Sequence, residues 1–131
     1  MREVLIDTSI WSSLLRKKQE DYQSQLLDLI DQGSVRIIGP IRQELLSGIK
    51  DINQFEILQS RLRAFPDVTI ATETYEMAAQ HYNICRSHGV QGSHIDFLIT
   101  AVAQYSDFEI WTDDKDFSRY AQYVSIRLFE S

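Results

Sequence analysis

The sequence predicts a single α/β domain with a mainly parallel central sheet covered by helices on both faces. Short apolar runs rich in β-branched residues alternate with longer segments in which apolar residues recur at helical spacing. Parallel strands need crossover connections, and the helix expected between successive strands supplies them. A chain of 131 residues with 44% hydrophobic residues is also the right size for one domain, residues 1–131, that buries its core without disulfides.

The chain begins with a short apolar strand at 4–6, which ends at Asp7. Thr8 or Ser9 then provides an N-cap for a helix that continues to Leu15. The first two elements are therefore a strand followed directly by a helix.

The next segment contains a helix, a strand and then two further helices. Apolar residues recur at helical spacing over 22–30, and the β-branched run 35–38 predicts a strand. Pro40 suits the first turn of the next helix, because its missing N–H has no partner there in any case. Asp51 can cap a further helix over 52–65.

The central segment predicts one more strand and two long helices. Alternating apolar residues predict a strand at 68–70, and a helical pattern follows over 72–87. Ser93, with Asp96 three residues later, resembles a capping box that opens a helix through Tyr105.

The chain closes with a strand at 110–111, an acidic helical turn at 113–116 and a last strand over 124–128. The expected order is β, α, α, β, α, α, β, α, α, β, α, β. Strands alternating with helices in this way predict a mainly parallel sheet.

Several acidic residues follow the ends of the expected strands. Asp7 comes directly after the first strand, and Asp114 and Asp116 lie just beyond Thr112, which follows the strand 110–111. Open parallel sheets bind ligands at the carboxyl edge of their strands. We therefore expect these acids to meet at that edge.

Glu44 and Asp96 can point toward the same edge from the early turns of their helices. Four distant segments would then bring carboxylates into one pocket. Such a cluster repels itself unless protons or cations neutralise it, and hard oxygen ligands suit Mg²⁺ or Mn²⁺. The simplest chemistry is metal-assisted hydrolysis of a phosphodiester, with the ion activating water because no basic residue stands out as a general base.

Each acid also has an ordinary structural interpretation. Asp7 can serve a loop or an N-cap, Glu44 can be a solvated charge on a helix, and Asp96 can belong only to its capping box. The acidic run 113–116 can be a solvated turn. Their joint placement at strand ends favours the functional interpretation.

The segments VLIDTSIW, RQELLSG, HIDFLITAVA and IWTDDKDF resemble, in this order, the four motifs of PIN-domain nucleases, with the spacing of VapC-type toxins. The resemblance covers nearly the whole chain. It implies a PIN-like three-layer α/β/α sandwich and an endoribonuclease that uses Mg²⁺, with Mn²⁺ as a substitute. It also implies the toxin of a type II toxin–antitoxin pair, with RNA as substrate, a cognate antitoxin as partner and a homodimer as assembly.

The same resemblance identifies Asp7, Glu44 and Asp96 with the metal-binding acids of the family. The final acidic motif falls on residues 112–117, where relatives differ in which acid they use, so Asp114 and Asp116 both remain candidates for the fourth acid. Ser9 and Thr112 match polar positions that support the pocket through hydrogen bonds.

Composition restricts the partners and the compartment. A net charge of −6 argues against a protein that coats nucleic acid, because phosphate binding depends on Lys and Arg. Cys85 is the only cysteine, so no intrachain disulfide forms, and its helical apolar surroundings predict a small buried residue. The basic run 16–18 is expected to be a solvated helix end rather than an RNA contact. We find no export signal and no apolar run near the roughly 20 residues that span a bilayer, and expect a cytoplasmic protein without a membrane segment.

Three other functions are less consistent with the residues. A receiver-like Mg²⁺-binding signalling domain needs paired acids after its first strand, where Asp7 stands alone, and an acid after the third strand, where Ala71 and Thr72 follow. A haloacid-dehalogenase-like phosphatase needs a second acid at Ser9. A catalytically inactive PIN-fold binding module does not require all of the acids that this chain has.

The histidines and tryptophans carry no clear chemistry. His81, His88 and His94 lack the i, i+4 spacing of a helical zinc site, so we expect surface or supporting roles. Trp11 and Trp111 follow strands, which favours core packing or a dimer contact over stacking with substrate.

Overall fold

The structure is a computed structural model that describes residues 2–16 and 20–130. Its centre is a four-stranded sheet with the strand order β2-β1-β3-β4 and only parallel pairings. The strands are β1 (Val4–Ile6), β2 (Val35–Arg36), β3 (Glu109–Trp111) and β4 (Arg127–Leu128). The α/β class with a parallel sheet is thus confirmed.

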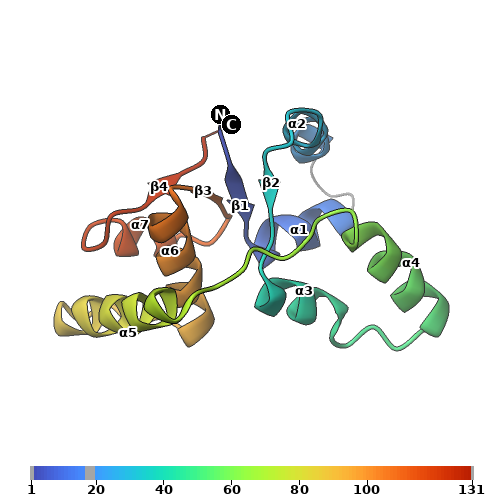
Figure 1. The fold of residues 1–131 in the computed structure, drawn as a ribbon. Helices are drawn as coiled ribbons and strands as arrows, with labels where there is room; N and C mark the ends of the chain where they lie inside the picture. The colour runs from blue at the N-terminus through green and yellow to red at the C-terminus, as the bar shows by residue number, and fades with distance from the viewer. Residues whose placement is uncertain (1, 17–19, 131) are drawn as a thin grey trace.

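Helices flank this sheet on both sides (Figure 1). They are α1 (Thr8–Leu15), α2 (Glu20–Asp31), α3 (Gly39–Leu46), α4 (Ile52–Leu62), α5 (Thr72–Ser87), α6 (His94–Ser106) and α7 (Asp116–Tyr120). In Figure 1 the first four lie to the right of β1, and the last three lie to its left. None of the described helices is long and apolar enough to cross a membrane.

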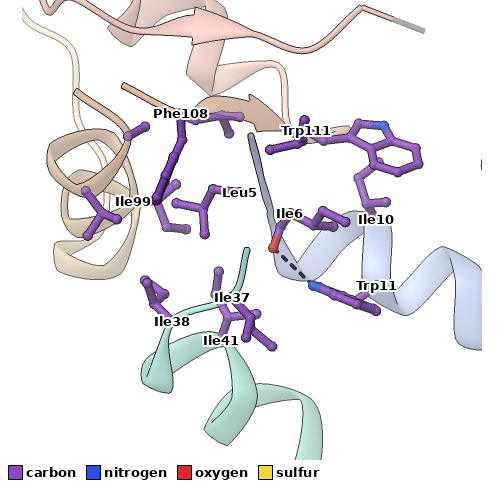
Figure 2. Packing of buried hydrophobic residues seen from close by; sticks show 14 of the residues in the cluster. Leu5, Ile6, Ile10, Trp11, Ile37, Ile38, Ile41, Ile99, Phe108 and Trp111 are labelled. Atoms are coloured by element: carbon purple, nitrogen blue, oxygen red, sulfur yellow. Dashed lines mark hydrogen bonds between the residues drawn. The ribbon is translucent and has the colours of Figure 1, made fainter. Parts of the chain in front are cut away.

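The core is built around β1, whose three residues are fully buried between two neighbouring strands. Figure 2 shows Leu5 directed toward Ile99 and Phe108, whereas Ile6 lies on the side of α1. Alternate residues of a strand point to opposite faces of the sheet, so β1 anchors the helices of both layers. The indole Nε1 of Trp11 donates to the carbonyl of Ile6 over 3.1 Å and ties α1 to the strand (Figure 2).

Both tryptophans belong to the core. Trp11 packs against Phe65 and Trp111 packs against Phe129, and neither indole is more than 4% exposed. Of the two roles considered for them, the structure supports core packing. The expected homodimer would have to use other surfaces.

The prediction of a strand at 68–70 is wrong. The structure has only an isolated bridge between Ile37 and Asp67, with the N–H of Val68 donating to the carbonyl of Ile37 over 2.9 Å. In this register residues 68–70 would pair with residues 38–40, but α3 begins at Gly39, so the extended segment opposite them ends before a ladder can form. A fifth strand is therefore absent from the described sheet.

Capping largely follows expectation. The Asp51 carboxylate accepts from the N–H groups of Asn53 and Gln54, as expected. Helix α1 differs, because Asp7 rather than Thr8 or Ser9 occupies its N-cap position, and the Asp7 side chain makes no capping bond.

Helix α5 carries the buried residues His81 and Cys85. His81 is buried and its Nδ1 pairs with Thr100 Oγ1 at 2.8 Å, so of the surface and supporting roles considered for the histidines only a supporting one remains for it. Burial lowers the pKa of His81. His88 and His94 are exposed, as expected. Cys85 is fully buried, also as expected. In the basic run, Arg16 is exposed, and residues 17–18 lie outside the described chain.

Replacing Ile6 in β1 with alanine should be strongly destabilising. Ile6 is fully buried, and truncation of such a side chain costs about 2–5 kcal/mol through lost transfer energy and a residual cavity. The same change at Ile57, which is 54% exposed on α4, should alter stability by no more than about 0.5 kcal/mol. Urea denaturation of the two variants measures the difference, and similar losses in both would contradict this account of the core.

Candidate metal-binding acid site

The pairing of β1 with β3 places two polar residues together at the carboxyl edge of the sheet. Ile6 lies opposite Trp111, and the N–H of Asp7 continues the ladder by donating to the Trp111 carbonyl over 2.9 Å. Asp7 and Thr112 therefore leave adjacent strands side by side, although 105 positions separate them. Asp7 is only 8% exposed.

Two hydroxyl groups hold the Asp7 carboxylate. Ser9 Oγ donates to Asp7 Oδ2 over 3.0 Å, and Thr112 Oγ1 donates to the same oxygen over 2.8 Å. The two hydroxyls are themselves 3.3 Å apart. A buried carboxylate needs such donors, and neutral donors leave its negative charge in place.

The acidic turn after β3 is ordered by the same hydroxyls. Asp113 N donates to Ser9 Oγ over 3.0 Å, and Asp114 N donates to Thr112 Oγ1 over 2.9 Å. Asp116 N in turn donates to Asp114 Oδ1 over 2.9 Å, which starts α7. The turn is thus held against Asp7 by side-chain bonds from both strand ends.

The Asp113 carboxylate is bonded away from these acids. It accepts a hydrogen bond from the hydroxyl of Tyr22 on α2, and this bond, together with burial, raises the pKa of Tyr22 to about 12. The ring of Tyr22 also packs edge-on against Trp111. Asp113 therefore links the acidic turn to α2.

Asp96 lies in the first turn of α6, and the start of this helix matches the expected capping box only in part. Ser93 is the N-cap and its hydroxyl accepts from Asp96 N over 3.0 Å. The Asp96 carboxylate, however, accepts from the hydroxyl of Tyr120 over 2.7 Å, where a complete box would have it bond the Ser93 backbone N–H. A buried phenol that has this carboxylate as its partner explains the departure.

Charge repulsion links three of the acids. Burial raises the pKa of Asp96, opposed by the hydrogen bonds from Tyr120 and Ser93, and the charges of Asp114 and Asp7 raise it further. Burial and the bond to Asp96 likewise raise the pKa of Tyr120. The carboxylates of Asp7, Asp96 and Asp114 consequently share one electrostatic environment.

Glu44 stands apart from these three acids, whereas Asp116 is bonded to Asp114 through its backbone N–H. Glu44 is exposed on α3, and within residues 2–16 and 20–130 no side-chain hydrogen bond or ion pair involves its carboxylate. Asp116 is half-buried, and its charge acts on Tyr120. Among the described residues, hydrogen bonds through Thr112 therefore connect Asp7 with the turn that carries Asp114, and Asp96 is linked to these two acids by charge alone.

The donor chemistry fits a small hard cation. Carboxylate oxygens are ligands that suit Mg²⁺ or Mn²⁺. In the described part of the chain, no three His, Cys, Asp or Glu side chains are close enough to enclose an ion by themselves. Mg²⁺ does not require this, because it is usually held through one or two carboxylates together with waters and substrate phosphates.

Tyr120 and Gly92 are parts of the site that the sequence did not reveal. Tyr120 lies 24 positions after its partner Asp96, and its spacing from Phe117 is that of an ordinary core residue. A Cβ at Gly92 would lie only 2.8 Å from Tyr120 Cζ. Neither contact has a local sequence signature.

Comparison with known protein families gives one assignment. The sequence pattern of the PIN domain matches residues 4–123, which is most of the chain. No curated protein sequence matches the chain.

Solved structures share the fold at low identity. FitAcB from Neisseria gonorrhoeae has a TM-score of 0.80 and 21% identity, with 97% of this chain and 96% of that one covered. VapBC2 from Rickettsia felis, bound to a DNA fragment from its promoter, has a TM-score of 0.81 and 15% identity, with 96% of each chain covered. DNA-bound VapBC from Salmonella typhimurium has a TM-score of 0.80 and 15% identity, with 98% of each chain covered.

The raised pKa of Asp96 predicts how stability depends on pH. The folded state holds the Asp96 proton more tightly than the unfolded state, whose aspartate pKa is about 3.9. The contribution of Asp96 to the free energy of unfolding is therefore largest when the pH lies below the unfolded pKa. This contribution decreases as the pH rises through the pKa of Asp96 in the folded state. Asp96→Asn should reduce this decrease and be at least as stable as the wild type at pH 7.

Urea denaturation of metal-free protein between pH 4 and pH 7 measures this effect. Asp107→Asn is the matched control, because Asp107 is exposed and lies before β3, at the opposite end of that strand from Thr112. If Asp96 acted only on the helix end, its neutralisation would instead cost about 0.5 to 1 kcal/mol at pH 7.

Proposed function

The chain belongs to the PIN domain family, and on that premise we propose that it is a Mg²⁺- or Mn²⁺-dependent endoribonuclease and the toxin of a toxin–antitoxin pair. The observation that best supports a nuclease is the placement of Asp7 and Asp114 side by side through hydrogen bonds to Thr112, with Asp96 near enough for their charges to raise its pKa. Members of this family are generally nucleases and typically use a divalent metal ion.

Asp7, Asp96 and Asp114 would hold the cation in this proposal. Ser9 and Thr112 orient Asp7 through its Oδ2. A bound Mg²⁺ supplies an activated water and stabilises the charge that develops on the phosphodiester. Asp114 is favoured over Asp116 as the fourth acid of the family pattern, because the N–H of Asp114 is bonded to Thr112 Oγ1, which also donates to Asp7. Glu44 remains a proposed member of the set on the resemblance alone.

An acidic chain can bind RNA if a cation bridges the two. With a net charge of −6 and acids gathered at one edge, the protein repels phosphate when no metal is bound. Asp7, Asp96 and Asp114 would no longer repel phosphate locally when they hold a cation. The proposal therefore couples RNA binding to metal binding.

Asp7→Asn should reduce RNA cleavage by more than about 100-fold, beyond the roughly 10- to 100-fold typical of groups that only orient a ligand. The purified chain is incubated with RNA and Mg²⁺ or Mn²⁺, with and without a chelator. Cleavage should stop in chelator, return with either ion and be poor with Ca²⁺, which prefers longer and looser coordination.

Asp107→Asn controls for loss of one negative charge, and its left-handed backbone (φ 60°) accepts asparagine readily. Glu44→Gln tests the remaining acid against Glu76→Gln, an exposed change on α5. Cleavage in chelator would reject the metal mechanism. A wild-type chain that binds metal and RNA without cutting would support an inactive binding module.

A groove between α1, α2 and α4 supports the antitoxin part of the proposal. Its volume is about 750 Å³, and its lining is mainly apolar. Leu15, Leu27 and Ile30 line it and are all exposed. An amphipathic helix of a partner can cover such a groove with its apolar face.

The acid cluster suggests how the partner would inhibit. An arginine inserted among Asp7, Asp96 and Asp114 would pair with carboxylates and occupy the place of the cation. We propose that the antitoxin combines a helix in the groove with such a basic side chain. A solved structure of similar fold from Klebsiella pneumoniae, with a TM-score of 0.67 and 21% identity, is described as a toxin–antitoxin complex.

Ile30→Lys should weaken antitoxin binding by at least about tenfold, since a charge would be buried in an apolar interface. Ile84→Lys is the matched control. Ile84 is 41% exposed against 39% for Ile30, and each lies in the last turn of its helix. Calorimetry with the co-expressed neighbouring protein measures the affinity, and RNA cleavage by both variants should match the wild type. Equal affinities would rule out the groove as the docking site.

A further inference from the structure

Tyr120 is an unusual partner for an acid of the site. It is fully buried, yet its hydroxyl donates to Asp96 Oδ2 over 2.7 Å. A buried phenol hydroxyl without a hydrogen-bond partner is unfavourable. The bond to the Asp96 carboxylate satisfies both groups. It also joins α7, which follows Asp114, to α6, which carries Asp96.

The tyrosine ring has no room to move. It packs against Phe97 at 4.8 Å and against Phe117 at 5.1 Å between ring centroids. On a further side it approaches the backbone of Gly92, where a Cβ would lie 2.8 Å from Tyr120 Cζ and 2.9 Å from Phe97 Cε2. The absence of a side chain at Gly92 therefore allows the ring to occupy this place.

The hydroxyl of Tyr120 competes with an alternative bond for the Asp96 carboxylate. Ser93 already caps α6, and an acid three residues after the cap ordinarily turns back to the backbone N–H of the cap residue. Here Oδ2 is bonded to Tyr120 instead. A carboxylate has about four lone-pair directions, so this bond leaves acceptor capacity for a cation.

We propose that Tyr120 is a positioning residue that holds the Asp96 carboxylate in the orientation that binds the cation, and that Gly92 is needed to seat it. This inference rests on the proposed metal-dependent function. A neutral donor orients the acid and keeps its charge, whereas a lysine or arginine there would neutralise it. Without the hydroxyl, Asp96 is free to close the capping box.

Tyr120→Phe tests this role because it keeps the ring and removes only the donor. We expect the dissociation constant for Mn²⁺, measured by calorimetry on the full chain without RNA, to rise about 10- to 100-fold, the usual effect of losing a group that orients a ligand. RNA cleavage should need correspondingly more Mn²⁺ for half-saturation and recover at high Mn²⁺. A purely structural role would lower the melting temperature without moving the Mn²⁺ affinity.

Tyr82→Phe is the matched control. Tyr82 also packs against Phe97, but its hydroxyl accepts from Arg86 rather than bonding an acid. Its Mn²⁺ affinity should equal that of the wild type. Gly92→Ala should weaken Mn²⁺ binding in the same direction as Tyr120→Phe, because the ring has to shift.

The outcomes separate this inference from the function on which it rests. If the wild type binds Mn²⁺ and cuts RNA while Tyr120→Phe binds Mn²⁺ within twofold of it, the positioning role is wrong and the nuclease proposal stands. If the wild type binds no Mn²⁺, both are wrong. A tenfold or greater loss in Tyr120→Phe, with Tyr82→Phe unchanged, supports the assignment.

Discussion

The acid site depends on the parallel register between β1 and β3. Each strand has three residues, and the bond from Asp7 N to the Trp111 carbonyl extends their ladder beyond the last pair. This bond makes Asp7 and Thr112 neighbours, and the hydroxyl of Thr112 then orders the turn that carries Asp114. A shift of one residue in the register would turn alternate side chains to the opposite face and separate the two. The fully buried β1 is the packing reason that such a shift is costly.

The donors to the site acids are neutral. Asp7 is bonded by Ser9 and Thr112, and Asp96 by Tyr120, all through hydroxyl groups. The ion pairs that the described residues form lie elsewhere, and they join Arg2 to Glu109, Arg36 to Glu3, Arg42 to Asp67 and Arg127 to Asp107. Hydroxyl donors orient a carboxylate and satisfy its buried oxygens without cancelling its charge. Repulsion among the acids therefore persists in the metal-free protein, which makes the site a place where a cation or a basic side chain gains binding energy.

How much of this arrangement can be predicted from sequence depends on the range of the contacts. Asp7 and Asp114 follow apolar runs, so the topology of parallel strands places them at one edge, and their grouping was predictable. The bond from Tyr120 to Asp96 was not, because it depends on how α6 and α7 pack around Gly92. The strand expected at 68–70 failed for a related reason: alternation indicates a suitable face, whereas pairing also needs an extended partner, and the chain opposite enters α3 at Gly39. Glu44 was placed by its helix alone, and no contact connects it to the other acids in the part of the chain described.

The groove and the acid site are joined through α2. Tyr22 on this helix donates to Asp113, whose backbone N–H donates to Ser9 Oγ, a donor to Asp7. Residues one turn later on the same helix, such as Leu26, line the groove. Tyr22 and Leu26 are four residues apart and therefore lie on the same face of the helix, so one rigid element contributes to both surfaces. A partner that packs on α2 therefore contacts the helix that helps to hold the acidic turn, so the two surfaces are joined by a short chain of hydrogen bonds as well as by proximity.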